Sequence, residues 1–260
     1  MSGFKWIGAT IGWALGGPIG AIIGLALGSA GDAFSSGKLG SFLNEGESTG
    51  RRTRYGTGGY NQQQRPQTHS GDFEVSLLIL ASVVIKADGV TDPKELEYVR
   101  SQFVSMYGKE RANKAFRLFK EINKQTINTR QVSLQIQRMM DHPSRLQLLH
   151  FLFNIAKSDG MVVDEEERQI ASIAGYLNIN SRDYNSIKAM FYNSSDNAYK
   201  ILEITKAASN DEVKRAYRKM VKKYHPDKVE HLGEEHKKGA ETKFKEVQKA
   251  YEYIQKERGM

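Results

Sequence analysis

A stretch of 26 residues without charge, from Trp6 to Gly31, is the feature that most limits what this chain of 260 residues can fold into. Within it, glycine recurs at every fourth position: Gly8, Gly12, Gly16, Gly20, Gly24 and Gly28. In a helix this spacing forms one smooth ridge, because residues i and i+4 share a face. In water each such glycine costs about 1 kcal/mol relative to alanine, whereas in lipid the ridge lets two helices approach closely. We therefore expect a membrane anchor that forms a homodimer through these glycines.

The geometry and orientation of the anchor depend on its length and its flanks. A helix of this length, at about 1.5 Å per residue, is longer than the ~30 Å hydrocarbon core, and its apolar part is too long for a cleaved signal peptide. Gly16-Gly17-Pro18 can kink or divide the helix, so a single span and a short re-entrant hairpin both remain open. Only Lys5 precedes the stretch, whereas five basic residues follow it: Lys38, Arg51, Arg52, Arg54 and Arg65. Positive charge stays on the cytoplasmic side, so we expect an inner-membrane protein whose remaining domains face the cytoplasm.

The rest of the chain divides into three further segments. After the anchor (1–34), residues 35–71 are rich in Gly, Ser, Asn and Gln and predict a flexible linker. Residues 72–195 and 196–260 show helical periodicity and meet at the polar cluster "NSSDN". Alternation typical of strands is scarce, so the predicted fold class is all-α.

Composition excludes several classes of function. The chain has no cysteine, which rules out disulfides, thiolate zinc sites and a cysteine nucleophile. The net charge of +8 lies at the two ends of the chain, and the central segment is almost neutral. Aromatic and basic residues are not interleaved, so we expect no nucleic-acid partner. No nucleophile–base pair, phosphate-binding glycine loop or pair of catalytic carboxylates is apparent, and we expect a protein that is not an enzyme.

The central segment contains a weak internal repeat with acidic residues at matching positions. "VVIKADGVTDPKELEYV" resembles "FNIAKSDGMVVDEEERQIASI", and each copy predicts a helix end, an Asp-Gly turn and an acidic helix start. The matched acids are Asp88 with Asp159, Asp92 with Asp164, and Glu95 with Glu167. Aspartate before a helix and glutamate in its first turn are ordinary helix caps. Six carboxylates in two turns can also hold Ca²⁺, Mg²⁺ or Mn²⁺ through oxygen ligands, so both interpretations stay open.

This duplicated pattern resembles the TerB domain of tellurite-resistance proteins. The resemblance covers roughly residues 72–193, and it implies a helical bundle whose clustered acids bind a divalent cation. The same segment contains a His-Pro dipeptide in "DHPS", between two stretches of helical period. We interpret it as a helix boundary in which Asp141 or His142 caps a helix that begins near Pro143.

The carboxy-terminal segment predicts two helices with a turn between them. Ser209 and Glu212 form a capping box at the start of the first helix. Its apolar residues follow the spacing of one buried face, and its basic residues form a stripe on another. Pro226 forces His225 out of helical geometry, so His225-Pro226-Asp227 should lie exposed at the tip of a turn. A second helix, from about Glu235 to Gln255, supplies a matching apolar seam.

The run "AYKILEI", "DEVKRAYRKMVKKYHPDK" and "KFKEVQKAYEYI" strongly resembles the J-domain of DnaJ-type co-chaperones. J-domains dock on the ATPase domain of a DnaK-type chaperone and trigger its ATP hydrolysis. The resemblance assigns the trigger to His225, Pro226 and Asp227. It assigns docking to Lys214, Tyr217, Arg218, Lys219 and Lys222. Two departures are Glu203, where many members have glycine, and the long loop "VEHLGEEHKKG" after the motif.

Anchor, linker, TerB-like segment and J-domain together resemble the DjlA-like, membrane-anchored branch of the DnaJ family. The sequence therefore predicts a membrane-tethered co-chaperone of a cytosolic DnaK-type chaperone that requires no cofactor. The alternative is a stress sensor at the membrane that responds to a divalent metal and uses its J-like end only for interaction.

Overall fold

The computed structural model describes residues 10, 13, 16–26, 70–89, 93–158, 160–192 and 196–260. All regular structure within these ranges is helical and none of it is strand, which confirms the predicted all-α class. The predicted linker lies almost wholly outside the described residues, and α3 begins at Ser70, just inside its predicted end.

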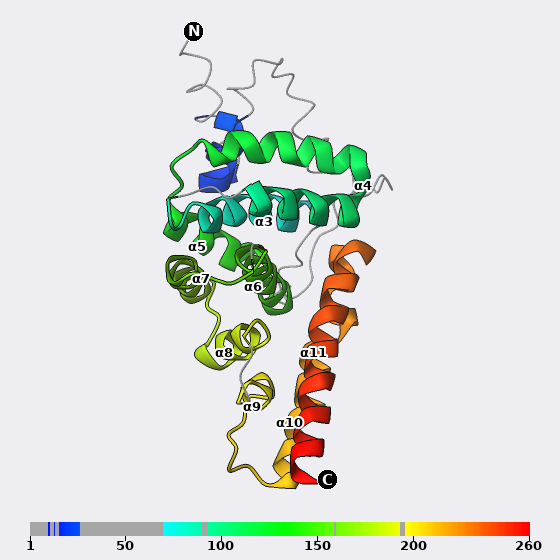
Figure 1. The fold of residues 1–260 in the computed structure, drawn as a ribbon. Coiled ribbons are helices and arrows are strands. Elements are labelled where there is room, and N and C mark those ends of the chain that lie inside the picture. Colours follow the sequence, from blue (N-terminus) through cyan, green and yellow to red (C-terminus); the bar gives the residue numbers. More distant parts are fainter. Residues whose placement is uncertain are drawn as a thin grey trace, which may run out of the picture.

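The central bundle comprises six helices that surround an apolar core (Figure 1). They are α3 (Ser70–Ile85), α4 (Pro93–Asn123), α5 (Thr129–Met139), α6 (His142–Ala156), α7 (Asp164–Tyr176) and α8 (Ser181–Ala189). Both α3 and α6 are apolar on nearly all sides, and their side chains are mostly buried, as expected for helices at the centre of a bundle. The long α4 breaks at Gly108, whose φ of +76° is readily adopted only by glycine.

The carboxy-terminal hairpin extends away from the bundle, with the end of the chain at its far tip (Figure 1). It consists of α10 (Asn210–Lys223), the 3-10 turn η1 (Pro226–Leu232) and α11 (Glu234–Arg258), with the short α9 (Asn197–Ile201) beside it. Both predicted helices are confirmed, and α11 is slightly longer than expected at each end. A hydrogen bond of 2.7 Å from the Tyr199 hydroxyl to Glu257 ties α9 to α11.

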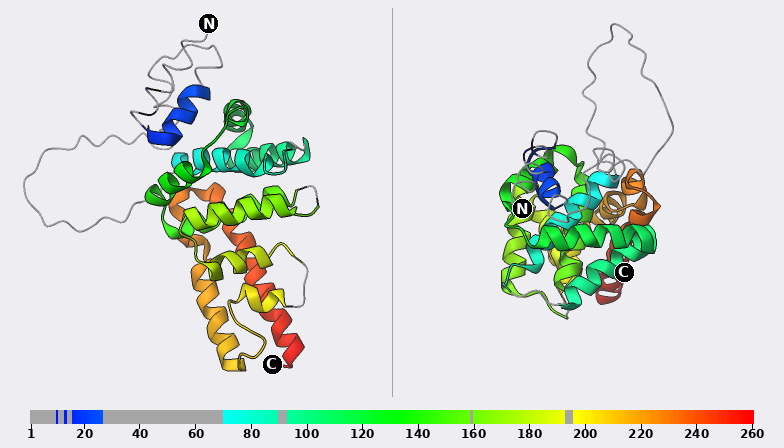
Figure 2. Two further views of the ribbon diagram at one scale, coloured as in Figure 1. Left: turned by 90° about the vertical axis from the view of Figure 1, so that its left-hand side faces the viewer. Right: turned by 90° about the horizontal axis from the view of Figure 1, so that it is seen from above.

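The hairpin and the bundle share one continuous core, which the sequence did not predict. The segment that was expected to be a long loop forms η1 and the start of α11, and it buries Val229, Leu232 and His236. The ring of His236 lies 4.5 Å from that of Phe73, and its Nε2 atom lies 2.8 Å from the hydroxyl of Tyr107. Figure 2 shows the first turns of α11 reaching into the bundle. We call this contact the junction.

Residues 16–26, the described part of the predicted anchor, pack against the central bundle (Figure 2). The amide of Gln135 donates to the Gly16 carbonyl at 2.7 Å and accepts from the Ile19 N–H at 3.0 Å. Gly17 has a φ of +59°, so the backbone departs from regular helix at the Gly16-Gly17-Pro18 sequence. Among the residues that the structure describes, no helix has both the length and the apolar character needed to cross a bilayer.

Candidate protein-docking site

The helix α10 presents the basic stripe by burying its opposite face. Ser209 caps the helix as predicted: its N–H donates to Glu212 at 2.7 Å, and its hydroxyl accepts from the Glu212 N–H at 3.3 Å. Val213, Ala216 and Met220 are buried at spacings of three and four residues. The basic side chains between these positions therefore project toward solvent along one side of the helix.

The predicted docking residues fall into two groups in the structure. Lys214, Arg218 and Lys222 are exposed, and within the described part of the chain no ion pair holds them. Lys219 is also exposed, but its ammonium group lies 2.8 Å from the Glu203 carboxylate. Tyr217 is half-buried and stacks on Tyr251 with ring centroids 4.1 Å apart, so it holds the two helices of the hairpin together.

The His225-Pro226-Asp227 turn lies at the end of this stripe and is open to solvent, as the sequence predicted. The side chain of His225 is 47% exposed and that of Asp227 is 68% exposed. The His225 Nδ1 atom lies 3.3 Å from the Asp227 carboxylate and accepts weakly from the Asp227 N–H at 3.4 Å. An exposed carboxylate on a proline-stiffened turn can form a charge-assisted hydrogen bond with a cation on another protein.

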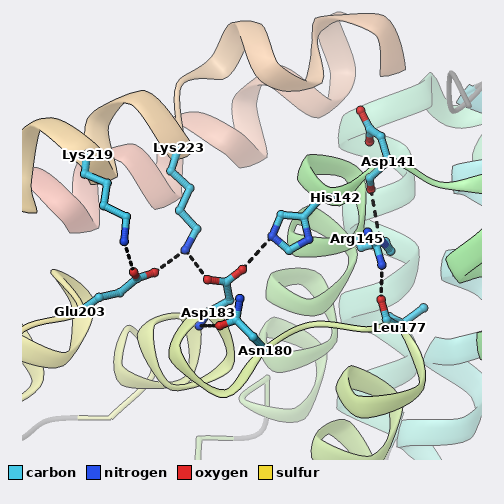
Figure 3. Close-up of polar contacts among 9 residues, drawn as sticks. All are labelled: Asp141, His142, Arg145, Leu177, Asn180, Asp183, Glu203, Lys219 and Lys223. Atoms are coloured by element: carbon cyan, nitrogen blue, oxygen red, sulfur yellow. Dashed lines mark hydrogen bonds and ion pairs between the residues drawn. The ribbon is translucent and has the colours of Figure 1, made fainter. Parts of the chain in front are cut away.

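Lys223, which the sequence did not single out, joins the end of α10 to the central bundle (Figure 3). Its ammonium group lies 2.6 Å from Asp183 on α8 and also pairs with Glu203, and only 17% of its side chain is exposed. Burial alone would raise the pKa of Asp183, but hydrogen bonds from His142 and Lys223 hold that pKa well below its usual value. In the sequence, Lys223 lies at the margin of the basic stripe, next to the buried face of the helix. That position is the only feature of the sequence that could have predicted its contact with the bundle.

The six predicted metal ligands do not form a described cation site. Asp92 and Asp159 lie outside the described residues. Glu167 is engaged by Lys188 and by the Tyr192 hydroxyl at 2.7 Å; burial would raise its pKa, but these contacts lower it. Asp164 is exposed and Glu95 is buried. Among the described residues no group of three or more His, Asp or Glu side chains is arranged to hold a metal. Metal binding, with Asp88 among its ligands, stays a prediction.

The structure describes two of the helix starts in the bundle for which a cap was predicted; one matches the prediction and the other corrects it. Asp141 caps α6 as predicted, because its carboxylate accepts from the Ser144 N–H at 3.0 Å. The cap of α7 is Val163 and not Asp164, which is the first helical residue. The Glu166 carboxylate accepts a hydrogen bond from the Val163 N–H at 3.0 Å. This contact at the start of α7 takes the place of the expected aspartate cap.

The glycine ridge is only partly within the described residues. Gly8, Gly12 and Gly28 lie outside them, Gly16 and Gly20 are half-buried, and Gly24 is buried. Homodimerisation through the ridge stays a prediction.

Comparison with protein families covers most of the chain. Residues 74–189 match the tellurite resistance protein TerB, and residues 197–259 match the DnaJ domain. Residues 1–54 match the transmembrane domain of the co-chaperone DjlA.

Two full-length relatives are each 28% identical to the chain, with 98% of both sequences covered: the co-chaperone proteins DjlA of Coxiella burnetii and of Photobacterium profundum. The chaperone protein DnaJ of Mesomycoplasma hyopneumoniae is 52% identical over 59 residues, which are 23% of this chain and 16% of that protein. No solved structure matches the chain.

Proposed function

We propose that the chain is a DjlA-like, membrane-associated J-domain co-chaperone, which docks on the ATPase domain of a DnaK-type chaperone and accelerates ATP hydrolysis there. The proposal places this activity at the cytoplasmic face of the inner membrane. The family match over residues 1–54 and the excess of basic residues after the anchor support that location.

The observation that carries the proposal is the exposed Asp227 at the end of a free cationic stripe. Lys214, Arg218 and Lys222 project from the same side of α10 and lead toward the turn. Positive charge of this kind steers an acidic partner surface into register. We propose that Asp227 then pairs with a cation of the partner, while His225 and Pro226 limit the freedom of the turn. The groups that hydrolyse ATP belong to the partner.

The test compares the ATP turnover of a DnaK-type chaperone with the full chain and with two variants, His225→Gln and Asp227→Asn. Both variants should fail to stimulate turnover. Asp227→Asn removes the negative charge that would pair with the partner's cation, and His225→Gln removes the imidazole that contacts Asp227. Asp211→Asn is the matched control, since it removes the same charge from an exposed site at the other end of α10. The control should stimulate as the unmodified chain does.

Neutralising Lys214, Arg218 and Lys222 together should act differently from the turn variants. We expect a higher concentration for half-maximal stimulation and a weaker dependence on salt, because these residues supply long-range attraction. Equal stimulation by the chain, His225→Gln and Asp227→Asn would refute the proposed function.

A further inference from the structure

One residue from each of the two His-Pro dipeptides, Pro143 and His225, lines the same narrow crevice, although the dipeptides are 83 positions apart in the sequence. Pro143 and Leu146 of α6 line one narrow crevice together with Tyr224, His225 and Val229. The helix boundary and the exposed turn are thus direct neighbours.

A polar contact next to this crevice fixes η1 to the start of α6. The Nε2 atom of His231 lies 3.2 Å from the Ser144 hydroxyl and 3.4 Å from the Asp141 carboxylate. Asp227 at the start of η1 is thus exposed, whereas Val229 and Leu232 are buried and His231 contacts the start of α6.

Asp183 holds the last turn of α10 from the other side (Figure 3). One carboxylate oxygen accepts from Lys223 at 2.6 Å, and the other lies 2.7 Å from the Nε2 atom of His142. The Asp183 N–H donates to Asn180 at 2.9 Å, which fixes the aspartate at the start of α8. Only 7% of its side chain is exposed, so this is a shielded ion pair rather than a surface one.

The contact orients the His225-Pro226-Asp227 turn without covering it. Lys223 is two residues before His225, so a fixed Lys223 fixes the point at which the backbone leaves the helix. His225 and Asp227 stay open to solvent, as do Lys214, Arg218 and Lys222. This arrangement leaves the docking face accessible, which argues against an inhibitory contact.

We propose that Asp183 is a positioning residue for the co-chaperone activity: the central bundle, through the Asp183–Lys223 pair, sets the orientation of the His225-Pro226-Asp227 turn. This inference rests on the proposed function. According to this inference, the bundle contributes to triggering the partner's ATP hydrolysis, because it orients the turn.

The test uses the full chain with Asp183→Asn, which keeps the shape of the side chain and removes its charge. Maximal stimulation of the partner's ATP turnover should fall by at least about fivefold, the lower end of ordinary coupling between sites. The concentration for half-maximal stimulation should stay unchanged, because the free stripe is untouched. Asp183→Glu should restore stimulation, since it restores the charge. Glu165→Gln, an exposed acid paired with Arg168 on α7, is the control and should have no effect.

A double-mutant cycle with Lys223→Met separates positioning from general destabilisation. Lys223→Met should lower maximal stimulation as Asp183→Asn does, and the double variant should be no worse than either single variant. Thermal unfolding of each variant confirms that the assay temperature lies below its transition. Protection of residues 223–229 against hydrogen exchange should fall in the folded variants.

Three results would overturn the inference. Full stimulation by Asp183→Asn, with Asp227→Asn inactive, would refute it and leave the proposed function intact. Additive losses in the double variant would show that the two residues act separately. A higher half-maximal concentration for Lys223→Met alone would show that Lys223 contacts the partner. If Asp227→Asn stimulates fully, the proposed function itself fails.

Discussion

Lys243 is a buried lysine, and burial is an unfavourable setting for its charge. It lies on α11 with only 2% of its surface exposed, and its ammonium group is 5.5 Å from the centre of the Tyr224 ring. Burial, and secondarily the charge of Lys223, lowers its pKa from 10.5 to about 7. A single cation–π contact offsets only part of the cost of burying a charge.

Replacing this lysine should therefore change how stability depends on pH. The unfolded chain holds the lysine proton up to about pH 10.5 and the folded chain only up to about pH 7, so stability rises with pH between these values. Lys243→Met should be more stable than the unmodified chain at pH 7 and should lose this rise. Urea unfolding at pH 7, 8 and 9 measures both effects. Lys245→Met, at an exposed site on the same helix, is the control. Parallel curves for Lys243→Met and the unmodified chain would contradict the assignment.

At the scale of elements, the ends of helices were predictable where neighbouring residues decide them. Ser209 with Glu212 and Asp141 with Ser144 are separated by three positions, so the sequence alone specifies these caps. The start of α11 was predicted to within one residue, but the burial of His236 in its first turn was not, because distant residues contact it. Phe73 and Tyr107 surround His236, and neither is near it in the sequence. Local pattern therefore predicted the hairpin and the exposed turn but missed the junction and Lys223.

Glu203 ends α9 in a conformation that explains the family preference for glycine. Its φ is +59°, and the next N–H, that of Ile204, donates back to the Tyr199 carbonyl at 3.0 Å, as in a helix that ends on a left-handed residue. Such a conformation costs a residue with a side chain about 1–2 kcal/mol. Glu203 offsets this cost through its contacts with Lys219 and Lys223.

Two substitutions at Glu203 should separate the free-energy cost of the left-handed backbone from the contribution of the ion pairs to stability. Both Glu203→Ala and Glu203→Gly remove the carboxylate, but only glycine relieves the backbone. The glycine variant should be more stable than the alanine variant by about 0.5–1 kcal/mol, after its greater unfolded-state entropy is counted. Urea unfolding measures the difference. If alanine were equal or better, the backbone at this site would not be left-handed in solution.

At the scale of the whole molecule, the bundle and the hairpin share one core, and a buried histidine lies at the junction between them. His236 is 1% exposed, and burial first, then the charges of Arg111 and His231, lower its pKa from 6.5 to about 4. The unfolded chain takes up a proton as pH falls through 6.5, whereas the folded chain does so only near pH 4. Stability should therefore decline as pH falls between these values.

His236→Phe should weaken this acid sensitivity, because phenylalanine can still pack on Phe73 but does not titrate. The melting temperature of the variant should fall less between pH 7 and pH 5 than that of the unmodified chain. Tyr107→Phe removes the hydrogen bond and keeps the histidine, so it should retain the acid sensitivity. His150 is also buried with a lowered pKa, and part of the effect should remain in His236→Phe. An unchanged pH dependence in that variant would place the sensitivity elsewhere.

The shared core of hairpin and bundle has a thermodynamic consequence. If the partner chaperone binds one arrangement of the junction more tightly than another, it changes the affinity of the bundle for any ligand with a similar preference. The reverse change is equal in size, because linkage between two sites is reciprocal. Binding of a ligand to the bundle would then change the affinity of the chain for the chaperone. Binding of the chaperone would change the affinity of the bundle for that ligand by the same factor.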